Sequence, residues 1–162
     1  MHYSNSFKRN SILYLFVFTA IVFLDQLTKQ LLIHKIGLNN SREFIPGIVS
    51  LTVVQNTGGA FSILNQYPIY FKIIGIVNAL LFSYFTFCPT VHFNILTKVG
   101  CACILGGTIG NLLDRFILNG VIDFVDLQVI NFAVFNLADI FIDCGVVLVI
   151  AGWCISKGKN SQ

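Results

Sequence analysis

The sequence contains few charged residues. Of its 162 residues only 10% are Asp, Glu, Lys or Arg, whereas 56% are hydrophobic. A water-soluble domain normally carries about 25% charged residues, so water could not solvate a folded chain with so much apolar surface. The length fits a single domain, residues 1–162. The composition places that domain in a lipid bilayer.

The charges that are present are scattered along the chain. Ten Lys and Arg residues against seven Asp and Glu residues give a net charge of +3. The basic residues stand singly or in pairs, so no run is dense enough to bind nucleic acid. The slight basic excess is better interpreted as a signal that orients the protein in a membrane.

Several familiar motifs are also missing. The five cysteines are odd in number and lie in apolar stretches, which argues against a disulfide framework. The three histidines are isolated and form no His-Glu-x-x-His motif, so they are poor material for a zinc site. There is no Gly-x-Ser-x-Gly nucleophile elbow either.

Four apolar segments are long enough to cross a bilayer, because a hydrocarbon core of about 30 Å requires roughly 20 helical residues. We expect an all-α membrane protein whose transmembrane helices lie at about 11–36, 69–88, 95–118 and 135–156.

Basic residues near the ends of these segments predict how the chain is oriented. Lys8 and Arg9 precede the first segment, His92 and Lys98 flank the link between the second and the third, and Lys157 and Lys159 follow the fourth. An even number of spans puts these residues on one side, which should be the cytoplasm. A few basic residues on the other side make the bias modest. We therefore expect both termini on the cytoplasmic side.

The outer connection at about 37–68 does not have a helical pattern. Residues 44–54 are rich in β-branched side chains and lead into the turn sequence Asn56-Thr-Gly-Gly59. Since residues 44–71 contain no charged side chain, we expect a small periplasmic β-like element that lies on the membrane surface. A second connection, at about 121–135, lies on the same side.

Two pairs of charged residues lie near the outer ends of the predicted helices. Asp25 and Lys29 are four residues apart and can form an ion pair across one helical turn, in a structural or a functional role. Asp114 and Arg115 are adjacent and point in different directions, so each needs its own partner. This arrangement favours a structural network.

Asp123 and Asp139 differ from the other acidic residues because residues 124–138 contain no Lys or Arg. If the connection folds back, the two carboxylates meet at one membrane depth with no cation close by in the chain. Such a pair shares a proton, so one carboxylate can activate water while its protonated partner polarises a carbonyl. The spacing alone leaves this aspartic-protease chemistry and a non-catalytic role equally open.

Two motifs containing glycine have simpler interpretations. Gly106 and Gly110 form a small-x-x-x-small pattern, which predicts close packing against another helix. The Asn56–Gly59 stretch predicts a turn, although Asn56 could also present its amide to the backbone of a ligand.

Five motifs together resemble one known family. Taken in chain order they are Asp25-Gln-Leu-Thr-Lys29, Gln55-Asn-Thr-Gly-Gly-Ala-Phe-Ser62, Gly106-Gly-Thr-Ile-Gly-Asn-Leu-Leu-Asp-Arg115, Gly120-Val-Ile-Asp-Phe124 and Phe135-Asn-Leu-Ala-Asp139. Each motif is weak alone, but their order on a four-span chain of this length resembles the bacterial lipoprotein signal peptidases, also called signal peptidase II. The resemblance extends from the first predicted helix into the fourth.

The resemblance implies an aspartic endopeptidase of the cytoplasmic membrane. Its substrates would be prolipoproteins whose cysteine already carries diacylglycerol, and it would cut directly before that cysteine. Members of this family act among membrane lipids, use no metal or other cofactor, and are blocked by the cyclic peptide globomycin.

The resemblance also implies roles for individual residues. Asp123 and Asp139 would form the catalytic pair. The implied substrate-binding residues are Asn56, Asn111, Arg115 and Asn136, and the implied supporting polar residues are Asp25, Lys29 and Asp114.

The sequence departs from the family pattern at two positions. Gly59 stands where many members have alanine, which could loosen the turn. Asp143 is not part of the pattern, although it falls on the same helical face as Asp139. It could perturb the titration of the pair, or it could face a polar cavity.

Two other functional classes compete with the peptidase. A small proton-coupled carrier or channel would also embed aspartates, but the chain shows neither paired repeats nor broken helices in matching halves. A structural membrane adaptor would leave the embedded carboxylates unexplained.

Overall fold

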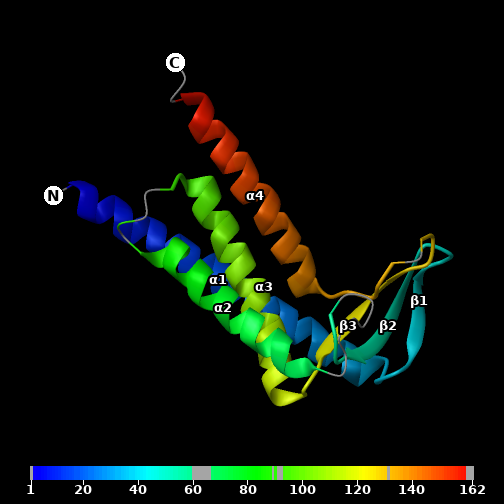
Figure 1. The fold of residues 1–162 in the computed structure, drawn as a ribbon. Helices are drawn as coiled ribbons and strands as arrows, with labels where there is room; N and C mark the ends of the chain where they lie inside the picture. The colour runs from blue at the N-terminus through cyan, green and yellow to red at the C-terminus, as the bar shows by residue number, and fades with distance from the viewer. Residues whose placement is uncertain (1, 60–66, 89, 91–92, 131, 160–162) are drawn as a thin grey trace.

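We describe the chain from a computed structural model, which covers residues 2–59, 67–88, 90, 93–130 and 132–159, with side chains between Ser11 and Gly158. Within these residues the chain forms four helices and three strands (Figure 1). In chain order they are α1 (His2–Lys35), β1 (Ser41–Ile45), β2 (Val49–Asn56), α2 (Pro68–Phe87), α3 (Ile95–Ile117), β3 (Val121–Leu127) and α4 (Leu137–Lys159).

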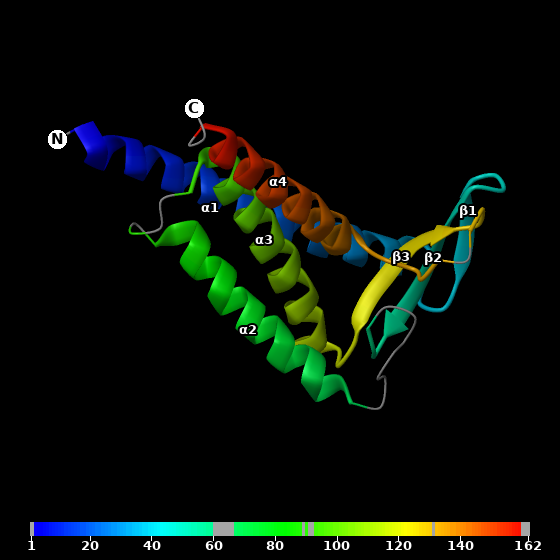
Figure 2. The same cartoon turned by 45° about the horizontal axis from the view of Figure 1, so that its top comes forward.

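The four helices are long and apolar enough to cross a membrane, which confirms the predicted fold class. Helix α3 is the central one: it contacts the other three helices, and its span is 72% buried (Figure 2). The spans of the other three are at most 17% buried and expose apolar side chains. This inverted pattern, with apolar residues outside, suits contact with lipid rather than water.

Glycine allows α3 to approach its neighbours closely. A Cβ atom at Gly106 would lie 2.9 Å from the Ile21 side chain of α1, so the predicted small-residue face packs as expected. A Cβ atom at Gly100 would lie 2.7 Å from the carbonyl oxygen of Gly145 in α4, and the reverse distance is also 2.7 Å. At this point the two backbones touch, which leaves no room for a side chain.

The three strands form an antiparallel sheet in the order β1-β2-β3. The sheet lies beyond one end of the helices, opposite the end where both chain termini lie (Figure 1). Val53, Ile122 and Phe124 are buried between the sheet and the C-terminal part of α1. This small core fixes β3, and with it Asp123, against the helices.

The first predicted span agrees with the apolar part of α1, Ser11–Lys35, and the helix itself begins earlier, at His2. Two other boundaries needed correction. Helix α4 begins at Leu137 rather than at 135 because the preceding residue, Asn136, caps it. The segment 44–54 is not continuous: Gly47, with a φ of 70°, turns the chain between β1 and β2.

The turn that follows β2 agrees with the prediction as far as Gly59. The Asn56 side chain accepts a hydrogen bond from the Gly58 N–H at 3.0 Å and donates one to the Gly59 carbonyl at 3.1 Å. Residues 60–62 of the same motif lie outside the described residues. Asn56 thus closes its own turn with the side chain that was expected to face a ligand.

Candidate active site

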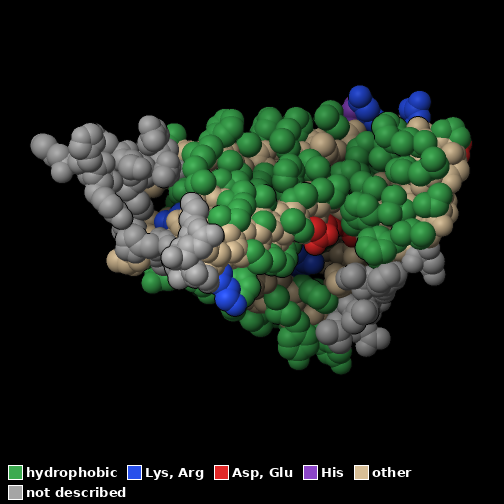
Figure 3. All heavy atoms as spheres, turned by 90° about the horizontal axis from the view of Figure 1, so that it is seen from above, with side chains coloured by type: hydrophobic (Ala, Val, Ile, Leu, Met, Phe, Trp, Pro, Cys, Tyr) green, Lys and Arg blue, Asp and Glu red, His purple; other side chains and the backbone are tan. Residues whose placement is uncertain are grey.

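A cavity of about 320 Å³ lies where α3, α4 and the sheet meet. Figure 3 shows acidic and basic side-chain atoms in a hollow that is surrounded mainly by hydrophobic side chains. The polar side chains that line the cavity are Asn56, Asn111, Arg115, Asp123, Asp139 and Asp143. Its apolar wall includes Val121, Leu127, Ile130, Phe132, Phe135 and Ile140. The cavity therefore brings Asp123 and Asp139 together from two different elements.

Asp139 is fixed by the way α4 begins. The Asn136 side chain accepts a hydrogen bond from the Asp139 N–H at 3.0 Å, and the Asp139 carboxylate accepts one from the Asn136 N–H at 3.1 Å. This reciprocal capping box satisfies two N–H groups that the first helical turn leaves without partners. The second Asp139 oxygen accepts a bond from the Asn111 amide at 2.8 Å. The partial positive charge of the helix N-terminus favours a carboxylate here.

Asp123 is fixed by the sheet and by two amides. It pairs with Val54 of β2, and its side chain is 4% exposed. The Asn56 amide donates to one carboxylate oxygen at 3.0 Å, and the Asn136 amide donates to the other at 2.7 Å. Asn136 therefore bonds both candidate catalytic carboxylates, through its side chain to Asp123 and through its backbone to Asp139.

The surroundings of Asp123 favour its protonated form. The pKa of Asp123 is raised to about 6, mainly by burial and also by the nearby charge of Asp139, while the Asn56 and Asn136 amides act in the opposite direction. An upward shift in one member is what a pair of carboxylates that shares a proton requires.

A buried ion triad lies behind the pair. The Lys29 ammonium is 2.8 Å from an oxygen of Asp25 and 2.8 Å from an oxygen of Asp114. It also donates to the Asn111 amide oxygen at 3.1 Å. Lys29 and Asp25 are almost fully buried. The predicted Asp25–Lys29 pair is thus confirmed, and it extends into α3.

Each carboxylate of the triad also accepts a hydrogen bond from a backbone N–H group. Asp25 accepts a hydrogen bond from the Ala138 N–H at 3.0 Å, and Asp114 accepts one from the Ile122 N–H at 3.1 Å. Ala138 and Ile122 directly precede the two candidate catalytic aspartates. The triad therefore ties both of them to α1 and α3.

Gln26 belongs to the same network, although the sequence interpretation did not single it out. Its amide donates to Asp114 at 2.9 Å and to the Gly110 carbonyl at 3.1 Å. The sequence signal that could have identified Gln26 was its position as an uncharged polar residue next to Asp25 in an apolar helix.

The remaining predicted site residues lie in different surroundings. Arg115 lines the cavity, donates to the Asn111 carbonyl at 3.4 Å and lies 5.5 Å from the ring centre of Phe71. Asn136 is fully buried and is not among the described residues of the cavity wall. Asp143 is exposed on α4 and lines the cavity.

Comparisons with known proteins show which family the chain is similar to. The family model described as signal peptidase (SPase) II matches residues 17–155. A lipoprotein signal peptidase of Streptococcus pyogenes serotype M3 is 39% identical over 148 residues, which cover 90% of this chain and 95% of the relative. Its counterpart in serotype M5 is 38% identical over the same shares.

Two solved structures described as bacterial membrane enzymes have the same fold. One has a TM-score of 0.81 at 28% identity and covers 92% of this chain and 91% of its own. The other has a TM-score of 0.76 at 30% identity, with 86% and 91% covered. Fold and sequence together define a membrane-embedded peptidase. The chain belongs to the signal peptidase II family.

Proposed function

We propose that this chain is an aspartic endopeptidase that removes signal peptides from diacylglyceryl-modified prolipoproteins by cutting before the lipidated cysteine. The observation that carries the proposal is the cavity in which Asp123 and Asp139 share Asn136 as a hydrogen-bond partner. Its position among helices that can span a membrane suits a substrate that is itself anchored in lipid.

In the proposed reaction the two aspartates have complementary tasks. Asp139, whose carboxylate lies at a helix N-terminus, takes a proton from a water molecule, which then attacks the scissile carbonyl carbon. Asp123 carries the shared proton and donates a hydrogen bond to the carbonyl oxygen, on which negative charge develops. The proton held by Asp139 then passes to the leaving amine as the carbon–nitrogen bond breaks.

The other polar residues bind substrate or hold the pair in place. Asn56, Asn111 and Arg115 line the cavity and would contact the polar backbone of the bound peptide. Asn136 is buried behind the cavity, so we assign it a positioning role rather than substrate contact. The supporting residues are Asp25, Lys29 and Asp114.

The same arrangement suggests where the enzyme works and what else binds it. The apolar cavity wall would contact the signal peptide, membrane lipids or an inhibitor of the globomycin type. The termini lie at the end of the helices away from the sheet, as expected if they are cytoplasmic and the site is near the outer face of the inner membrane (Figure 1).

Cleavage of a synthetic lipobox peptide whose cysteine carries diacylglycerol tests the proposal. In detergent the wild-type enzyme should cut this peptide before the cysteine, and globomycin should block the reaction. Asp123→Asn and Asp139→Asn should each abolish cleavage while the protein keeps its fold.

Asp126→Asn is the matched control for these variants. Asp126 lies on β3 with Asp123, but it bonds Thr52 at 2.8 Å and is not among the described residues of the cavity wall. This variant should cleave normally. Retained activity in Asp123→Asn or Asp139→Asn would show that the catalytic pair is assigned wrongly.

A further inference from the structure

Asp143 differs from the other acidic residues because it forms no hydrogen bond or ion pair with any residue that the structure describes. All seven acidic residues of the chain lie in the described part, and six of them form a hydrogen bond or an ion pair there. Asp143 forms neither within the same residues, although it lies in an apolar helix that can span a membrane. An ionisable side chain at this depth is costly and marks a functional site by default.

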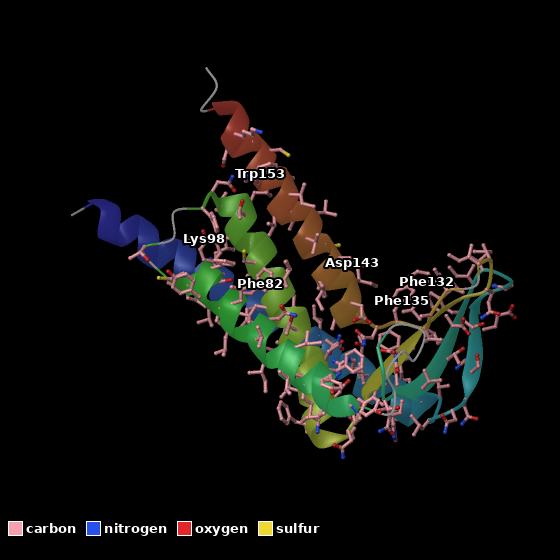
Figure 4. The ribbon with its side chains drawn as sticks, viewed as in Figure 1. Phe82, Lys98, Phe132, Phe135, Asp143 and Trp153 are labelled. Atoms are coloured by element: carbon pink, nitrogen blue, oxygen red, sulfur yellow. The ribbon has the colours of Figure 1, made fainter. Side chains whose placement is uncertain are left out.

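The position of Asp143 relative to Asp139 follows from helix geometry. Residues four apart lie on one face, and a rise of 1.5 Å per residue separates them by about 6 Å along the axis. Both side chains line the same cavity. In Figure 4, Asp143 lies on the side of α4 that faces the loop carrying Phe132 and Phe135. Asp143 is therefore one helical turn farther than Asp139 from the sheet end.

The proposed substrate would run past Asp143. A signal peptide precedes the scissile bond and contains an apolar segment that enters the bilayer, so it extends from the catalytic pair toward the ends of the helices where the termini lie. An extended peptide advances about 3.3 Å per residue, so 6 Å corresponds to about two residues. Asp143 then lies beside the second residue before the cleaved bond.

We propose that Asp143 is a specificity-determining residue that accepts a hydrogen bond from a serine or threonine at the second position before the cleaved bond. This inference rests on the proposed function. A carboxyl group accepts hydrogen bonds in either protonation state. The neighbouring wall is apolar at Ile140 and Phe135, so a small neutral hydroxyl can enter without burying a second charge.

Two diacylglyceryl-modified peptides that differ only in serine or alanine at this position test the inference. With wild-type enzyme, kcat/KM should favour the serine peptide by about threefold to tenfold, the size of one hydrogen bond from a neutral donor. In Asp143→Ala the ratio should fall to about one, because the acceptor is gone. Asp143→Asn should keep part of the preference, since its amide oxygen still accepts.

Val147→Ala is the matched control, because Val147 lies one turn further along the same face of α4 and is not among the described residues of the cavity wall. It should keep the wild-type ratio. Asp143→Val repeats the test if the alanine variant does not fold. The ratio is the readout because a purely structural role of Asp143 would lower both rates together.

The outcomes separate this inference from the proposed function. A wild-type ratio near one, or an unchanged ratio in Asp143→Ala, would each overturn the inference and leave the peptidase assignment intact. Failure of the wild-type enzyme to cut either peptide would instead contradict the proposed function.

Discussion

Asn136 connects the two carboxylates on which the proposed chemistry depends. It caps α4 and bonds Asp139, and it donates its side-chain amide to Asp123 at 2.7 Å. Its side chain also donates to Asn111, which in turn bonds Lys29. The fully buried Asn136 side chain thus holds the two carboxylates in place, although it is not among the described residues that line the cavity.

Replacing this residue should therefore affect the chemical step more than substrate binding. In Asn136→Ala we expect kcat to fall about tenfold to hundredfold, because hydrogen bonds to charged groups contribute about 1.5–3 kcal/mol. KM should change little. Steady-state kinetics with the lipobox peptide measure both constants. A rise in KM with an unchanged kcat would instead indicate direct contact with substrate.

The raised pKa of Asp123 gives a prediction for the pH profile. The proposed mechanism needs a proton on Asp123, whose pKa of about 6 results mainly from burial. The value of kcat/KM should therefore fall as pH rises through about 6, approaching tenfold per pH unit. Initial rates between about pH 4.5 and 8 check this limb. A rate that rises through pH 6 would mean that Asp123 acts as the base.

The buried triad makes Lys29 important for stability. Lys29→Met removes the cation that faces Asp25 and Asp114, and loss of one partner from a buried ion pair costs about 3–5 kcal/mol. We expect a clearly lower melting temperature in detergent. Lys35→Met is the matched control, because Lys35 is exposed at the end of the same helix. Equal stability of the two variants would contradict a supporting role for the triad.

Part of this site could be predicted from local sequence. The i, i+4 spacing of Asp25 and Lys29 predicts their ion pair, because helix geometry alone places them on one face. The second partner of Lys29, Asp114, could not be predicted, since it depends on how α1 and α3 are rotated against each other. The capping box also has a local sequence signal, because Asn136 lies three residues before Asp139.

At the scale of elements, the packing of α3 against α4 determines where Asp139 lies. A Cβ atom at Gly107 would overlap the carbonyl oxygen of Ala138, directly before Asp139. Gly107→Ala should therefore displace the first turn of α4, with loss of activity and about 1–3 kcal/mol of stability. Gly158→Ala is the control on α4, because nothing lies within 4 Å of a Cβ atom there. Activity assays and thermal unfolding in detergent distinguish the two variants.

The elements themselves were predictable to different degrees. Long apolar runs predict spanning helices because a bilayer demands them, and the bounds of α2 and α3 differ from the predicted ones by one residue at most. The hairpin between β1 and β2 was missed because the β-branched pattern continues on both sides of Pro46-Gly47. A Pro-Gly dipeptide is itself a turn signal, but the β-branched residues around Pro46-Gly47 favour an extended strand.

At the scale of the whole molecule, both termini lie at one end and the sheet lies at the other (Figure 1). We expect a C-terminal alkaline phosphatase fusion to be inactive, because the enzyme would remain in the cytoplasm. Phosphatase inserted at the exposed β1–β2 turn, at Gly47, should be active. Assays of phosphatase activity in intact cells decide the orientation. The reverse pattern would place the catalytic cavity toward the cytoplasm.

The triad also determines when during synthesis the site can form. Asp25 reaches the Ala138 N–H, which lies 113 residues later in the chain, and Lys29 reaches Asp114. As α1 enters the bilayer, its partners have not yet been made, so Asp25 and Lys29 can neutralise only each other. The alignment of the two proposed catalytic carboxylates is completed only when the last helix inserts. A half-made chain therefore remains unable to cut the precursors that are being inserted beside it.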